Sequence, residues 1–267
     1  YMVQKTIANP THPHTKFSTG NAATLGKIPA TTLKSWFKKH YAASGMHLVI
    51  YGKQPLKVLR EKASELFAKV PRRHPIKKRK YGPIFSKDTQ GKMVFVKPLK
   101  HLRQLSIMWE VPDFFARAPQ KPFDLIVHAL ARGQKYSLAE RLKEKGLTES
   151  IEPYSYKLGA DYLFFGIDLQ LTEKGVLNKE EVITQVFQAL HHFKINSIPK
   201  YLFQELNETQ ALSYQYQKRE HPFQFVMKHA GMIAEESLAS YPRQTLFLSN
   251  YDADLLTQAL IWLDPKY

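Results

Sequence analysis

Residues 103–111 read RQLSIMWEV, and residues 162–171 read YLFFGIDLQL. In the first stretch Leu105, Ile107 and Trp109 alternate with other residues, which is the period of a strand with one buried face. The second stretch is a stronger strand candidate, because aromatic and aliphatic residues fill most of it. We expect two further strands, at Glu149–Tyr156 and at Lys92–Lys97.

Helical patterns dominate the sequence after these strands. One helix is expected to stop at Gly146, and the last one to begin at the N-cap Asp252. Strands followed by helices favour an α+β fold, in which helices pack on one face of a mostly antiparallel sheet. The expected helices lie at about 119–132, 137–145, 178–195, 199–217, 222–236 and 252–263.

The first 70 residues show a second, shorter alternation of helix and strand. Residues 1–8 are typical of the end of a helix, and residues 9–29 of a loop rich in Pro, Gly and Asn. Thr31 or Thr32 is expected to cap a helix with an apolar face, and Pro55 to start another. The other predicted features are an apolar face of Leu33, Trp36, Phe37 and Tyr41, a strand at Met46–Tyr51 and a second apolar stripe from Leu56 to Val70.

Composition excludes several classes of protein. The chain has 267 residues, of which 43% are hydrophobic, so it is long and apolar enough to bury a core. The absence of cysteine excludes disulfides, thiolate catalysis and cysteine-built zinc sites. No apolar stretch in the sequence is long enough to span a bilayer, and residues 1–8 lack the pattern of a secretory signal.

The net charge of +16 raises the question of a nucleic-acid partner. The densest basic run, from Arg72 to Lys80, lies between prolines, and no nucleic-acid-binding motif accompanies it. We therefore interpret residues 76–90 as a basic, Pro-rich linker and expect no nucleic-acid partner. Acidic regions of a longer protein are a further explanation for the excess charge.

A search for catalytic motifs finds none. Neither a His-x-x-x-His nor an inverted His-x-x-Glu-His zinc motif occurs. His12 and His14 flank a proline, and the adjacent His191 and His192 would point about 100° apart on a helix. The sequence also lacks a Gly-x-Ser-x-Gly elbow and a phosphate-binding loop. We therefore predict no catalytic and no metal-binding residue in this chain.

A family resemblance gives the sequence a more specific interpretation. The loop Asn9–Asn21 reads NPTHPHTKFSTGN, which resembles the Asn-Pro-x-His-Pro-x-x-x-Phe-x-x-Gly-Asn segment of the pitrilysin/insulin-degrading-enzyme (insulinase) family of inverted-motif zinc metallopeptidases. The similarity covers nearly the whole chain and continues, in order, through Phe37–Gly52, Ile107–Asp113, Ser137–Gly146, Phe164–Gly175 and Lys218–Pro222.

The resemblance implies that the chain is an internal fragment of a larger enzyme. Residues 1–75 would end the first peptidase-like domain, and residues 91–267 would form most of a second, non-catalytic one. The family's zinc motif would then lie before Tyr1, and its second catalytic lobe after Tyr267. Zinc is thus expected as a cofactor of the parent protein, a metalloendopeptidase that degrades peptides in a closed chamber, and not of this fragment. The expected partners are peptide substrates and the remaining domains of the parent. The compartment stays open, since the resemblance allows both the bacterial periplasm and the cytoplasm.

The resemblance also implies a place where peptides bind. Members of the family hold the substrate N-terminus at an exosite in the second domain, partly by adding a strand to a sheet edge. In this chain Gly133 stands where a family Glu could receive the amino terminus, and Pro153 cannot donate a backbone hydrogen bond. The resemblance leaves two interpretations of Glu152, a substitute acidic anchor or an exposed residue of an ordinary strand. The exosite-like residues that we predict are His128, Ile151, Glu152 and Tyr154, beside Ala131 and Pro153.

Two other functions remain open at this point. A non-catalytic relative, similar to the inactive subunit of processing peptidases, would bind polypeptides without cleaving them and could have the same sequence features. Nucleic-acid binding through the basic surface is the weaker alternative, and it would be steeply salt-dependent.

Overall fold

The computed structural model describes residues 2–73, 81–158 and 162–267, so the predicted basic run Lys77–Lys80 lies outside the described residues. Contacts divide the chain into two compact units. Unit 1 contains residues 1–15, 82–212 and 248–267, and unit 2 contains residues 16–81 and 213–247.

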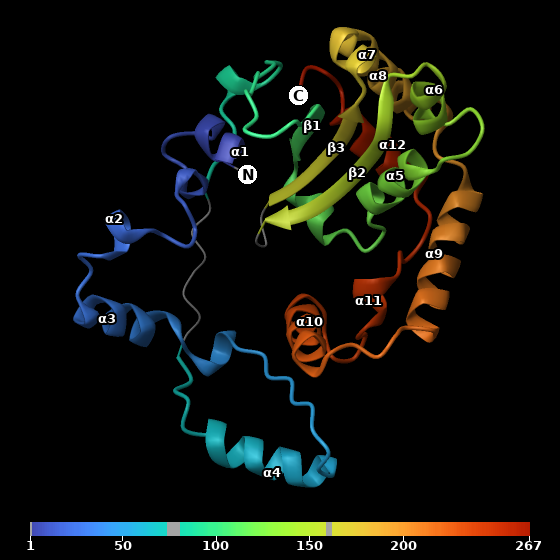
Figure 1. Ribbon diagram of the computed structural model, residues 1–267. Coiled ribbons are helices and arrows are strands. Elements are labelled where there is room, and N and C mark those ends of the chain that lie inside the picture. Colours follow the sequence, from blue (N-terminus) through green and yellow to red (C-terminus); the bar gives the residue numbers. More distant parts are fainter. Residues whose placement is uncertain (1, 74–80, 159–161) are drawn as a thin grey trace. The chain divides into compact units, whose positions relative to one another are not determined.

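Unit 1 is built on a three-stranded antiparallel sheet, in the order β1-β3-β2 (Figure 1). The strands are β1 (Gln104–Val111), β2 (Thr148–Leu158) and β3 (Tyr162–Leu171). The central strand is the one with the most apolar sequence, because it has a neighbour on both sides and a covered face. The antiparallel sheet and the strands predicted at 103–111, 149–156 and 162–171 are confirmed.

Helices cover one face of this sheet (Figure 1). The odd-numbered residues of β3 point into the main core, where the Phe165 ring lies 5.7 Å from Trp109 and 5.6 Å from Phe123. This confirms the predicted α+β class. Besides the short α1 (Met2–Ile7), the described helices of this unit are α5 (Pro122–Ala131), α6 (Leu138–Glu144), α7 (Glu173–Leu177), α8 (Lys179–Asn196), most of α9 (Lys200–Gln215) and α12 (Ala253–Ile261).

The helix ends follow local rules. The Asp252 side chain accepts the N–H of Leu255 and caps α12 as predicted, and Gly146 follows α6 with a φ of +67°. Three short segments form single 3-10 turns and a fourth, after β1, is slightly longer: Pro13–Thr15, Ala43–Gly45, Lys87–Thr89 and Asp113–Arg117. None of the described helices has the length and apolar character needed to cross a bilayer.

Two segments lie on the opposite face of the sheet, and we call them the neck: residues 8–12, which follow α1 (Met2–Ile7), and residues 82–85. Ala8 pairs with Phe85, and the Asn9 N–H donates to the Ile84 carbonyl at 2.7 Å. Ile84 is fully buried with Phe164 of β3. The neck therefore holds side by side the segments next to the first point where the chain leaves unit 1 and the first point where it returns.

Two side chains fasten the neck to the sheet. The Glu110 carboxylate of β1 accepts the backbone N–H groups of Ile84 and Phe85, at 2.9–3.2 Å. His12 Nε2 lies 3.1 Å from the Tyr162 hydroxyl, which donates to the Gly82 carbonyl at 3.1 Å. Burial lowers the pKa of His12, which favours the neutral ring. His12 thus helps to hold the neck against the sheet.

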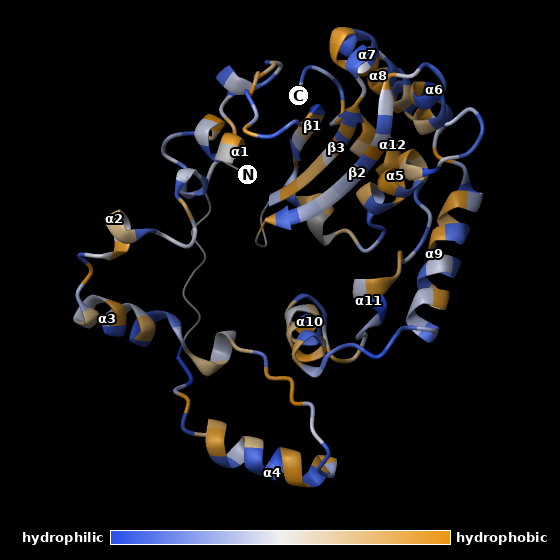
Figure 2. Ribbon diagram, in the orientation of Figure 1, coloured by the Kyte–Doolittle hydropathy of each residue, from blue (hydrophilic) through white to orange (hydrophobic). Residues whose placement is uncertain are grey.

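Unit 2 contains helices whose apolar faces are exposed. Trp36, Phe37 and Leu66 are 53%, 56% and 69% exposed, and Figure 2 shows the apolar stripes of α3 and α4. The predicted cap at Thr31 or Thr32 is wrong, because Pro29 occupies the N-cap position and forms no side-chain cap. The helices are α2 (Ala22–Leu25), α3 (Ala30–His40), α4 (Leu56–Phe67), α10 (Pro222–Glu235) and α11 (Arg243–Leu246).

Two predicted strands are wrong. Residues 46–51 and 92–97 form no ladder with any other described segment. A strand needs a hydrogen-bonded neighbour as well as an apolar pattern, and Ile50 and Phe95 are 43% and 76% exposed. Tyr51 instead packs against Phe225 of α10, with ring centroids 5.5 Å apart.

Candidate substrate-binding surface

Strand β2 carries three of the four predicted site residues and forms an outer edge of the described sheet. Ile151 lies opposite Leu169 and packs against the main core, on the helix side. Glu152 and Tyr154 lie opposite Asp168 and Gly166, on the other face. Neighbouring residues of a strand point to opposite faces, so the predicted residues are split between two sides of the sheet.

Pro153 lies between them, opposite Ile167. In sheets, proline is accommodated where its missing N–H would face away from the neighbouring strand. Pro153 therefore removes one donor from the outer edge of β2. The backbone groups of successive strand residues point alternately to the two sides, so the outward-facing N–H groups that remain nearest to it belong to Ile151 and Ser155. A peptide added along this edge would place alternate side chains near the two faces.

His128, the fourth predicted residue, belongs to an ionic cluster on the helix side. Its Nε2 lies 3.3 Å from Glu205 Oε1 of α9, and Arg132, one turn further along the chain, donates from Nη1 to Glu205 Oε2. The Arg132 guanidinium also lies 5.7 Å from the Tyr201 ring. The hydrogen bond from Arg132 holds the pKa of Glu205 below its usual value, with a smaller contribution from His128. The cluster ties α5 to α9.

The variant Arg132→Met is expected to raise the pKa of Glu205 towards 4.5, because it removes the donor that stabilises the carboxylate. The measurement is an NMR titration of the Glu205 carboxyl carbon in both proteins. Lys200→Met, at the start of the same helix, removes one positive charge without removing this hydrogen bond and serves as the control. An unchanged Glu205 titration in Arg132→Met would contradict the arrangement.

Tyr154 forms an aromatic wall on the other face. Its ring lies across Gly166, where an added Cβ would collide with Tyr154 Cζ. The rings of Tyr154 and Tyr156 are 6.0 Å apart, and Tyr156 stacks on Phe164 at 5.1 Å. Burial first, then the charge of Asp168 and the neighbouring Tyr156, raises the pKa of Tyr154 to about 12. The hydroxyl is therefore neutral near pH 7 and can donate a hydrogen bond.

The structure thus brings Glu152 and Tyr154 together and separates them from His128 and Ile151. It also adds residues that the sequence interpretation did not include, namely Asp168, Arg132 and Glu205. Two sequence patterns could have indicated Asp168 and Arg132, whereas Glu205 has no such pattern. Asp168 is a lone carboxylate within an apolar strand, and His128 and Arg132 are four residues apart on one helix face.

The described residues do not fit a zinc site. No group of three or more His, Asp or Glu side chains within residues 2–73, 81–158 and 162–267 is arranged to hold a metal ion. His12 and His14 have ring centroids 6.5 Å apart, and the two ring nitrogens of His12 contact Tyr162 and the His14 N–H. No catalytic step through zinc is therefore derived from these residues.

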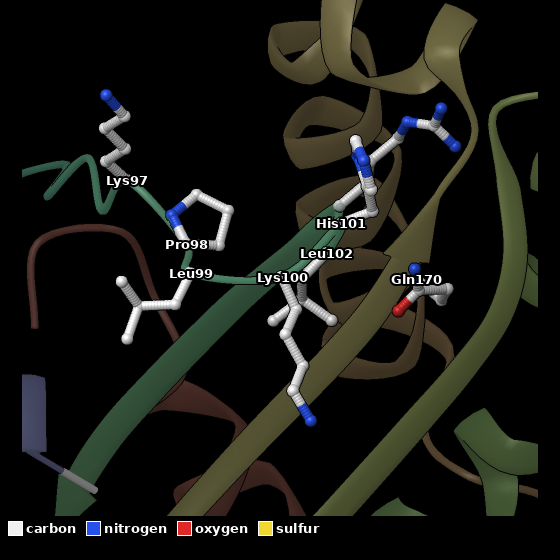
Figure 3. A pocket seen from close by; sticks show the side chains of 8 residues that line it. Lys97, Pro98, Leu99, Lys100, His101, Leu102 and Gln170 are labelled. Carbon is white, nitrogen blue, oxygen red and sulfur yellow. The ribbon is translucent and has the colours of Figure 1, made fainter.

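A groove of about 400 Å³ lies before β1, lined by residues 97–103 and Gln170 (Figure 3). Its basic side chains are exposed, and the side chains of Lys97 and Lys100 point in different directions. Arg103 is paired with Glu173 at 2.6 Å. Because these charges do not converge, we assign no binding function to the groove.

Comparison with known proteins gives consistent results. A family profile described as the peptidase M16 inactive domain matches residues 27–210. The chain is 29% identical over 275 residues to the A-factor-processing enzyme of Saccharomyces cerevisiae, covering 100% of this chain and 27% of that protein. It is 28% identical over 268 residues to mug138 of Schizosaccharomyces pombe, whose name includes the term zinc protease, covering 97% and 26%.

The fold is also that of a solved peptidase structure. The crystal structure of pitrilysin matches with a TM-score of 0.91 at 24% identity, covering 99% of this chain and 29% of that one. The chain therefore spans little more than a quarter of the length of each of these relatives.

Proposed function

We propose a role for this chain from the fact that it belongs to the M16 peptidase family. It forms part of the wall of a chamber in which peptides are degraded. It supplies a peptide-binding surface there, but no catalytic residues. The resemblance to the pitrilysin/insulin-degrading-enzyme family is thereby confirmed. The observation that carries the proposal is the match of residues 27–210 to a domain described as inactive. It agrees with the lack of a metal-holding group among the described residues.

The proposed domain division remains the one that the resemblance implied. Residues 1–75 would complete a first peptidase-like domain, residues 76–90 a linker, and residues 91–267 a second, non-catalytic domain. The exposed apolar faces of α3 and α4 support this division, because a helix with such a face usually packs against a partner. We propose that the remaining domains of the longer protein supply that partner.

The proposed peptide-binding place is the outer edge of β2 with the residues on its two faces, Glu152 and Tyr154 on one and His128 and Ile151 on the other. An extended peptide would bond to the backbone of this edge, and its side chains would give selectivity. Most of the positive charge lies outside the strands of the sheet. Residues 16–81 contain sixteen Lys and Arg and two Glu, so they carry +14 of the chain's net charge of +16. This distribution favours a peptide, rather than a nucleic acid, as the partner of the sheet.

The longer protein is proposed to be a zinc-dependent metalloendopeptidase whose metal is held by residues outside this chain. The experiment is to purify the longer protein, measure its zinc content and follow peptide cleavage with and without a chelator. About one zinc per chain is expected, because a catalytic site of this kind uses one ion. Cleavage should stop when the chelator is added.

A non-catalytic, polypeptide-binding relative is the second candidate. The description of the matching domain as inactive favours it as well. The same experiment separates the two, since a correctly folded longer protein that contains no zinc and cleaves no peptide would support the second candidate and contradict the first.

A further inference from the structure

One carboxylate interrupts the apolar central strand. Asp168 lies in the middle of β3, on the face that carries Glu152 and Tyr154. Its Oδ1 is buried and accepts no hydrogen bond from any described residue. A buried carboxylate oxygen without a donor is unfavourable by itself, so a donor from outside the described residues would stabilise this carboxylate.

The neighbours of Asp168 do not supply a positive charge. The residues directly opposite it are Ser106 on β1 and Glu152 on β2, and no ion pair within the described part of the chain includes Asp168 or Glu152. Two carboxylates facing each other across a strand pair repel. Other carboxylates of the same unit do have partners, as Glu173 has Arg103 and Glu181 has Lys145.

An aromatic surface adjoins these carboxylates. The Tyr154 ring lies across Gly166, two residues before Asp168, and it is close enough for the Asp168 charge to raise its pKa. Tyr156 and Phe164 extend the row of rings. An aromatic face attracts a cation, and an aliphatic stem packs well on it.

This combination fits the side chain of a lysine or an arginine. The stem would lie on the Tyr154 ring, and the charged head would meet the carboxylate of Asp168, a residue that is only partly buried, with the exposed Glu152 beside it. The head would form charge-assisted hydrogen bonds there. A metal ion fits less well, because no third carboxylate or imidazole among the described residues completes a ligand set.

We propose that this face of the sheet binds a basic side chain of the bound peptide, and that Asp168 is the residue that selects it. The inference rests on the proposed peptide-binding function and deepens it. It names the substrate class as extended peptides with a Lys or Arg that reaches the centre of β3.

The test compares two fluorescein-labelled peptides that differ only in a lysine and its uncharged analogue norleucine. Fluorescence anisotropy measures their affinity for the 267-residue chain, for Asp168→Asn and for Glu144→Gln. The last variant removes a charge from an exposed position on α6 and serves as the control. Thermal unfolding checks all three proteins, and Asp168→Asn should be at least as stable as the wild type because it removes a buried charge without a partner.

The wild type and Glu144→Gln are expected to bind the lysine peptide about tenfold more tightly than the norleucine peptide, as for one charged hydrogen bond. Asp168→Asn should bind both with the same affinity. Equal affinities in the wild type, or a preference that persists in Asp168→Asn, would overturn the inference while leaving the proposed function intact. If neither peptide binds any of the proteins, the proposed function fails as well.

Discussion

Replacing Phe165 by alanine should lower the free energy of unfolding of unit 1 by about 3–5 kcal/mol, the range for a fully buried phenylalanine. Phe165 has 0% exposure and packs between Trp109 and Phe123. The variant therefore leaves a cavity where the sheet meets α5. Urea unfolding followed by circular dichroism measures the difference.

Phe114→Ala is the matched control. Phe114 follows β1 and is 50% exposed, so the same change of side chain removes little buried area. We expect it to cost less than about 1 kcal/mol. Equal losses for the two variants would contradict the position of Phe165 at the centre of the core.

Removing the Glu110 carboxylate should release the neck. In Glu110→Ala, the N–H groups of Ile84 and Phe85 lose their acceptor. Buried donors without a partner cost about 1–3 kcal/mol, so a loss of stability in that range is expected, with faster amide exchange at Ile84 and Phe85. Glu110→Gln keeps an acceptor oxygen and should lose less than half as much. If glutamine is as damaging as alanine, hydrogen bonding by residue 110 is not what holds the neck.

The same carboxyl predicts a dependence on pH. Burial raises the pKa of Glu110 above 4.5, although the two backbone N–H groups oppose the shift. The folded state therefore binds this proton more tightly than the unfolded state does. The resulting stability is fully present below the unfolded pKa and is lost as pH rises through the raised folded pKa. Glutamine does not titrate at this position. When the pH is raised from about 4 to 7, the free energy of unfolding of the wild type should therefore fall relative to that of Glu110→Gln.

The sheet was predictable from the sequence because its pattern is local. Leu105, Ile107 and Trp109 alternate in β1, and the apolar run of β3 identifies its central position. The long helices followed from their periodicity and from caps such as Asp252. These features depend on neighbours within a few residues, so one sequence is sufficient to find them.

Apart from the helix cap expected at Thr31 or Thr32, the errors arose where structure depends on distant partners. Residues 46–51 and 92–97 have the composition of strands, but no described segment pairs with them. The neck was not predicted at all, since it joins residues 8–12 to residues 82–85 and to Glu110 through contacts between distant parts of the sequence.

The candidate site was predictable only as a list of residues. The resemblance identified His128, Ile151, Glu152 and Tyr154, but only the structure shows that Glu152 and Tyr154 share one face of the sheet, that Ile151 packs on the other, and that His128 lies on α5 beside Glu205. The same register brings Asp168 beside Glu152. Similarity to relatives cannot replace this geometry, because the match to the solved structure concerns the fold.

The most direct test of the central proposal is one titration that reports binding and cleavage together. A quenched fluorescent peptide is added to the purified 267-residue chain, with and without zinc, while anisotropy and fluorescence intensity are followed. We expect saturable binding of the peptide, with no increase in fluorescence intensity, whether or not zinc is present. Cleavage that stops when a chelator is added would contradict the assignment of this chain as a non-catalytic, peptide-binding wall.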